Sequence, residues 1–154
     1  MIAPPKTYAQ WMALLKTFAE GSADEDVLHA MRTGTLVWQS GVAERFAQRF
    51  SDALNARMNR ASDVFDRDMK RAADERAMIG ALLALRRSLV FLHTAAALPA
   101  LPEEQRTQFT ALVQSAADRM QESLDRSAQS DRTGRMRALV RGHQVNALEM
   151  EEHL

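Results

Sequence analysis

The chain has 154 residues, a length that fits one domain with a sizeable core rather than two domains. Its 20 basic and 20 acidic residues give a formal net charge of zero, so it lacks the positive excess typical of proteins that bind nucleic acids or membrane surfaces. It contains no cysteine, which excludes disulfides, thiolate metal sites and a cysteine nucleophile. The first residues do not form a secretory signal, so we expect a cytoplasmic protein.

Two short helices are expected at the start of the chain. Thr7 and Gln10 form the T-x-x-Q pattern of a capping box, which predicts a helix from residue 8 to the glycine at residue 21. Ser22 and Glu25 repeat this pattern and predict a second helix that ends near residue 32, before Gly34. One face of the first helix is apolar and carries Tyr8, Trp11, Leu14, Leu15 and Phe18.

A long helix is expected near residues 36–73, where the chain has no proline and a single glycine, Gly41. Ser40 is an alternative N-cap for this helix. Its apolar residues are spaced mostly four apart, so their stripe winds around the helix and meets different neighbours at its two ends. The opposite face carries charges of both signs, as expected of a solvated surface, and includes Arg57, Asp63, Asp66, Arg67 and Lys70.

The most apolar stretch runs from residue 77 to residue 98 and is apolar on nearly every side of a helix. We therefore expect it at the centre of the fold, with neighbours on every side. One predicted seam contains Leu82, Leu85, Leu89, Leu92 and Ala96, and a second contains Ile79, Leu83, Val90 and Leu98. Arg86 and Arg87 argue against a membrane span, because each would cost roughly 2.5 to 3.5 kcal/mol at the middle of a bilayer.

A third long helix is expected over residues 102–129, after two prolines that stop the central helix. Ser130 and Asp131 are candidate caps for a last short helix that ends at Gly142. We expect residues 1–6 to be frayed, and residues 143–154 to be frayed or attached to a partner. The sequence therefore predicts one all-α domain over residues 1–154: an up-and-down helical bundle of three long helices with short N-terminal and C-terminal helices packed on it.

No motif fixes a reaction. The nearest approach to the Glu-x-x-His signature of di-iron bundles is a single Asp26-x-x-His29, and His93 has no acidic residue within one turn. Sequences typical of a nucleophile elbow or a phosphate cradle are missing. We therefore predict no catalytic residues, no metal and no cofactor.

The densest polar stretch lies near the C-terminus and could bind an anion. Its arginine forks and small hydroxyl groups, next to a helix start, suit a phosphate or a carboxylate, whereas a capped and solvated helix explains the same residues. The candidate anion-binding residues are Arg132, Arg135, Arg137 and Arg141.

Self-association is expected through the longest helix. At 1.5 Å per residue it would rise roughly 57 Å, more than its neighbours can cover, and exposed clusters of large apolar residues usually mark an interface. The candidate interface residues are Phe46, Phe50, Phe65 and Met69. The alternative is a monomer whose N-terminal helices, with Trp11, Leu15 and Phe18, complete the cover.

For function we expect a non-enzymatic helical interaction or scaffold protein that acts through its bundle surface as a homo-oligomer, a symmetric dimer in the simplest case. A further protein partner fits this interpretation, whereas a membrane partner does not. The second interpretation is a nucleic-acid or phosphate-ligand binder that uses the arginine cluster, and the third is an enzyme with a pocket between helices. Generic helical bundles share this sequence pattern without sharing a function.

Overall fold

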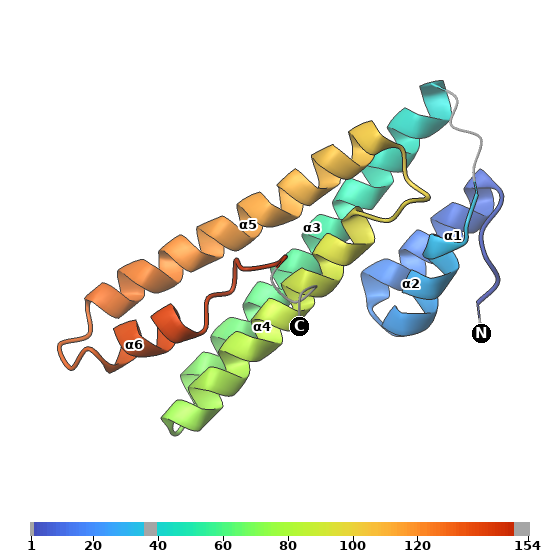
Figure 1. The fold of residues 1–154 in the computed structure, drawn as a ribbon. Coiled ribbons are helices and arrows are strands. Elements are labelled where there is room, and N and C mark those ends of the chain that lie inside the picture. The colour runs from blue at the N-terminus through green and yellow to red at the C-terminus, as the bar shows by residue number, and fades with distance from the viewer. Residues whose placement is uncertain (1, 36–39, 150–154) are drawn as a thin grey trace. The chain divides into compact units, whose positions relative to one another are not determined.

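The computed structural model describes residues 2–35 and 40–149, and all regular structure within these ranges is helical. The prediction of an all-α helical bundle is therefore confirmed. Six helices follow one another (Figure 1): α1 (Tyr8–Glu20), α2 (Asp24–Arg32), α3 (Ser40–Arg71), α4 (Glu75–Ala96), α5 (Glu103–Gln129) and α6 (Arg135–Gly142). The long helix begins at Ser40 and ends at Arg71, and residues 36–39 of its predicted range lie outside the described residues. The role of Ser40 as an N-cap stays a prediction.

The N-terminal helix caps were predicted in part. Thr7 caps α1 through the expected capping box: its Oγ1 accepts from Gln10 N at 3.2 Å, and the Gln10 side chain accepts from Thr7 N at 3.2 Å. Gly21 ends α1 in the left-handed region at φ 74°, which favours glycine. The second predicted box is wrong, because the N-cap of α2 is Ala23 and no side chain caps it.

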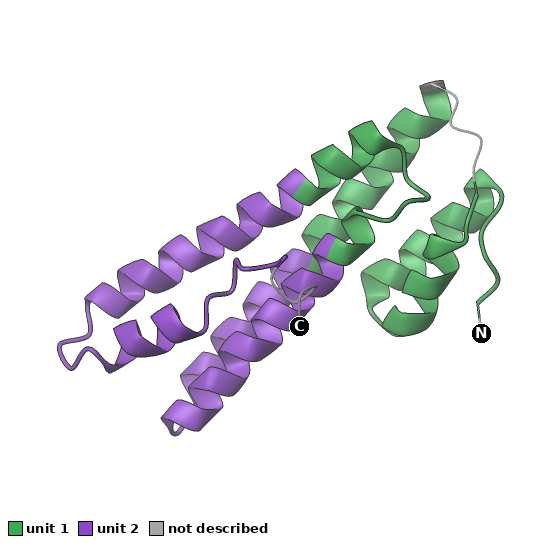
Figure 2. Ribbon diagram, viewed as in Figure 1, with its two compact units in different colours: residues 1–57, 94–110 green, residues 58–93, 111–154 purple. Residues whose placement is uncertain are grey.

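Contacts divide the chain into two compact units (Figure 2). Unit 1 contains residues 1–57 and 94–110, and unit 2 contains residues 58–93 and 111–154. Each unit is discontinuous in sequence, because α3, α4 and α5 all run from one unit into the other.

An aromatic cluster forms the core of unit 1. The Trp11 and Phe46 rings meet edge to face, with their centres 5.4 Å apart. Phe46 stacks on Phe50 with the ring centres 5.7 Å apart. Phe50 in turn meets Phe109 edge to face, at 4.7 Å between the ring centres. Phe18 of α1 lies 5.7 Å from Phe50. The first helix therefore covers the apolar stripe along the first half of α3.

The N-terminal segment is held against this cluster, contrary to the expectation of a frayed start. Pro5 is buried, and its carbonyl accepts from Thr35 N at 2.8 Å. Trp11 Nε1 donates to Thr35 O at 3.0 Å. Gly34 has no room for a side chain, since a Cβ there would lie 2.7 Å from Trp11 Cζ2 and 2.8 Å from Pro5 Cγ.

Arg57 ties α3 to both N-terminal helices. Its guanidinium donates to the two Asp24 carboxylate oxygens at 3.0 and 2.9 Å and to Phe18 O at 2.8 Å, and it lies 5.3 Å from the centre of the Phe18 ring. Only 13% of its side chain is exposed. The placement of Arg57 on a solvated face was therefore wrong. The two hydrogen bonds to the Asp24 carboxylate and the contact with the Phe18 ring offset the free-energy cost of removing the Arg57 guanidinium from water.

The two predicted seams of α4 have different outcomes. Leu82, Leu85, Leu89, Leu92 and Ala96 are all buried, which confirms the first seam. In the second seam Leu98 is buried, but Leu83 is 41% exposed and Ile79 and Val90 are half-buried. The expectation of cover on every side of this helix was therefore wrong.

The segment after α6, predicted to be frayed or attached to a partner, packs on its own unit. Val145 and Leu148 are buried. Side chains of α4 and α5 bind its backbone: Arg86 donates to Ala147 O at 3.1 Å, Gln114 donates to Asn146 O at 3.0 Å, and Gln121 Oε1 accepts from Val145 N at 2.9 Å. The prediction of fraying is thus wrong for residues 143–149, because scattered glutamines and an arginine replace the hydrogen bonds that a helix would supply. Residues 150–154 lie outside the described residues.

Candidate functional site

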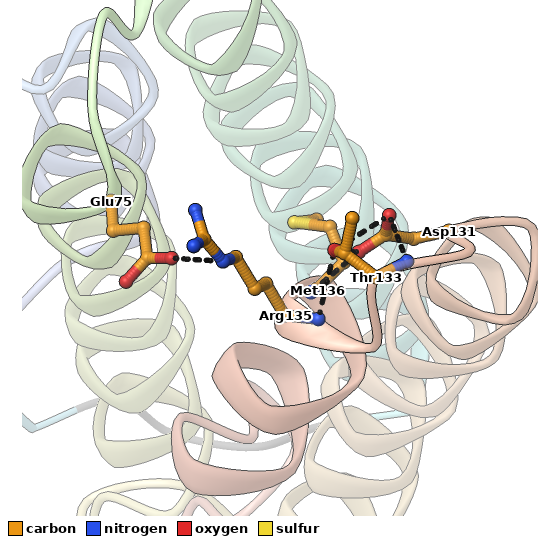
Figure 3. A network of polar contacts seen from close by, with 5 residues as sticks. All are labelled: Glu75, Asp131, Thr133, Arg135 and Met136. Carbon is orange, nitrogen blue, oxygen red and sulfur yellow. Dashed lines mark hydrogen bonds and ion pairs between the residues drawn. The ribbon is translucent and has the colours of Figure 1, made fainter.

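The polar corner between α5 and α6 is organised by Asp131 (Figure 3). Its carboxylate accepts from Met136 N at 2.9 Å, from Thr133 Oγ1 at 2.9 Å and from Thr133 N at 3.2 Å. The hydrogen bond from Met136 N, followed by those from Thr133, holds the pKa of Asp131 below its ordinary value of 3.8. Asp131 was predicted as the cap of the last helix. The N-cap residue of α6 is instead Gly134, and Asp131 binds the first turn of α6 from three residues before that N-cap.

The four predicted anion-binding arginines are all exposed. Arg135 Nε lies 3.9 Å from Glu75 Oε1, in a pair whose side chains are 78% and 55% exposed. The Asp131 carboxylate already accepts from the first turn of α6, where a phosphate would otherwise bind. Anion binding by this cluster stays a prediction.

A cleft of about 480 Å³ lies beside this corner, within unit 2. Its apolar lining consists of Met78, Met136 and Leu139. Its polar lining has three carboxylates and one guanidinium, those of Asp74, Glu75, Asp131 and Arg135, and also includes Thr133. The excess of negative charge disfavours an anionic ligand in this cleft.

The candidate metal ligands are not brought together. Asp26 and His29 are both exposed on α2, and His93 is half-buried on α4. Among the described residues, no group of three or more His, Cys, Asp or Glu side chains could hold a metal ion.

The four predicted interface residues separate into two pairs. Phe46 and Phe50 are fully buried in unit 1, so they cannot form an interface in the folded chain. The prediction is wrong for these two because Trp11 and Phe18 cover them, which is the alternative that the sequence left open. Phe65 and Met69 belong to unit 2 and are half-buried, so their role at an interface stays a prediction.

Two apolar side chains that the sequence did not single out as surface residues are exposed in unit 2. Val64 is 37% exposed on α3, and Leu83 is 41% exposed on α4. In the most apolar stretch of α4, 28% of the residues are buried. By length and composition alone α4 could cross a membrane, a test that core helices of soluble proteins also pass.

Arg86 and Arg87 weigh against a membrane position for α4. Arg86 donates to Ala147 O, and Arg87 is exposed. The two stand about 100° apart around the helix, so one can lie near the core while the other reaches solvent. Both would face a high cost in hydrocarbon.

Comparisons with protein-family models, with curated proteins and with solved structures find no match to this chain.

Proposed function

We propose that this protein is a non-enzymatic interaction or scaffold protein that acts through the surface of its helical bundle as a homo-oligomer. The observation that carries the proposal is the incomplete cover of α4. This helix has the composition of a core element, yet 28% of its most apolar stretch is buried.

Exposed apolar residues on single helices are common and need no partner. The exposure on α4 is stronger evidence for an interface, because Leu83 lies in the most apolar stretch of the chain. Ile79 and Val90 on the same helix are half-buried. Removing apolar surface from water lowers the free energy by about 25 cal/mol per Å². Burial of this surface therefore favours association with a second helical surface.

Sedimentation equilibrium over a hundredfold dilution series at micromolar concentration tests the proposal. We expect a mass that exceeds 17.3 kDa and falls towards that value on dilution. Leu83→Glu should weaken association, whereas the control Arg87→Glu changes an exposed charge on the same helix and should not. A constant mass of 17.3 kDa throughout would refute the homo-oligomer.

A further inference from the structure

The exposed side of α3 in unit 2 carries a compact set of charges, which we call the α3 charged face. It consists of Asp63, Asp66, Arg67, Lys70 and Arg71, which are all exposed and line one hollow of about 470 Å³. The first four recur at intervals of three and four residues and therefore share one side of the helix. The two acids come first in the sequence and the three bases follow.

These charges have few partners within their own chain. In the described part of the structure, the side chains of Asp63, Asp66, Lys70 and Arg71 make no hydrogen bond or ion pair. Arg67 contacts its neighbour Asp68 at 3.4 Å, in a pair whose side chains are 54% and 42% exposed. Pairs four residues apart, such as Asp63 with Arg67, could form within the helix, but the structure does not form them. The charged groups are therefore available to a partner.

We propose that two copies of this chain pair antiparallel through the α3 charged face, about a two-fold axis between Asp66 and Arg67. This inference rests on the proposed homo-oligomer: it adds the α3 charged face to Leu83 of α4 as contact surface and gives the contact an orientation. At 1.5 Å per residue, Asp63 and Lys70 lie about 5 Å along the helix on either side of that axis. An antiparallel copy consequently brings Asp63 opposite Lys70, and Asp66 beside Arg67.

The two-fold symmetry repeats each pair, so four attractions form from two kinds of contact. A parallel arrangement would instead place Asp63 beside Asp63 and Lys70 beside Lys70, which repel each other. Charge pairs of this kind determine orientation more than affinity. Val64, which is 37% exposed next to Asp63, supplies apolar surface at the edge of the same face.

Charge reversal gives a direct test in two variants. The first variant combines Asp63→Lys and Asp66→Lys, and the second combines Arg67→Glu and Lys70→Glu. Each turns the four attractions into repulsions, so each should raise the dissociation constant of self-association at least about tenfold. An equal mixture of the two variants restores opposite charges and should form a one-to-one heterodimer. Raised salt should weaken wild-type association.

Matched controls change the same number of exposed charges elsewhere. Glu44→Lys with Glu122→Lys is the control for the first variant, and Arg49→Glu with Arg119→Glu is the control for the second. Circular dichroism checks that every variant keeps its helix content. The controls should associate as the wild type does.

The remaining outcomes separate this inference from the proposed function. If the wild type associates and both reversal variants associate equally well, the α3 pairing is refuted while the homo-oligomer stands. If both variants are monomeric and their mixture is also monomeric, the pairing of two α3 charged faces is refuted. If the wild type sediments at 17.3 kDa throughout, both proposals fail.

Discussion

Replacing Leu89 by Ala should destabilise the protein far more than the same change at Leu83, six residues earlier on α4. Leu89 is fully buried, so the change removes three carbon groups from the core at about 0.8 kcal/mol each and leaves a cavity. The expected loss is about 3 kcal/mol, within the roughly 2 to 5 kcal/mol range of such truncations.

Leu83 is 41% exposed, so about three-fifths of the same transfer energy is lost, roughly 1.4 kcal/mol. No closed cavity forms, and the higher helix propensity of alanine returns a few tenths of a kcal/mol. The expected loss is about 1 kcal/mol, which leaves a difference of about 2 kcal/mol between the two variants.

Urea denaturation followed by circular dichroism measures both values, with protein dilute enough to suppress self-association. The slope of unfolding free energy against urea should match the wild type in both variants, because the surface exposed on unfolding hardly changes. Equal losses for Leu83→Ala and Leu89→Ala would refute the one-sided cover of α4, and a loss below about 0.5 kcal/mol for Leu89→Ala would refute its burial.

Four further changes test other parts of the structure. Gly34→Ala should lower the unfolding free energy by about 1 to 3 kcal/mol, because its Cβ would collide with Trp11, and a neutral result in urea denaturation would contradict that contact. Arg57→Met should cost about 2 to 3 kcal/mol in the same assay, since it leaves Asp24 without its bidentate partner, whereas the exposed Arg49→Met should be nearly neutral. The pKa of Asp131 is lower in the folded state than its ordinary 3.8, so its stabilising effect is complete above that value and is lost as the pH falls through the folded pKa; thermal melts should show a shallower acid loss for Asp131→Asn than for the wild type. Arg135→Gln with Arg137→Gln should leave stability unchanged, and filter binding should find no salt-dependent nanomolar retention of nucleic acid by the wild type; such retention, reduced in the variant, would favour the phosphate-binding interpretation.

The helices could be predicted from the sequence because their signals are local. The capping box of Thr7 and Gln10, the left-handed Gly21 and the prolines before α5 each act on the backbone within a few residues. The buried seam of Leu82, Leu85 and Leu89 follows from helical periodicity alone.

The missed features depend on contacts between residues far apart in the chain. Arg57 is read as a surface charge by periodicity, and only the approach of Asp24 and the Phe18 carbonyl makes its burial favourable. The segment after α6 has no periodic pattern, and its order depends on Gln114 and Gln121 of α5. In the candidate site, the four arginines are close together in sequence, but the carboxylates of Asp74 and Glu75 that line the cleft with Arg135 come from far earlier in the chain.

The interleaving of the two units has a consequence for the order in which the chain can fold during synthesis. Phe50 obtains its edge contact from Phe109, so the aromatic cluster of Trp11, Phe46 and Phe50 stays open on one side until α5 has been made. The contact between α1 and α2 is local and can form first. Because α3 and α5 run through both units, neither unit corresponds to a contiguous fragment. A ribosome-bound chain in which residue 109 is still inside the ribosome should therefore be protease-sensitive around α3, and one in which residue 109 and the rest of α5 have emerged should be protected.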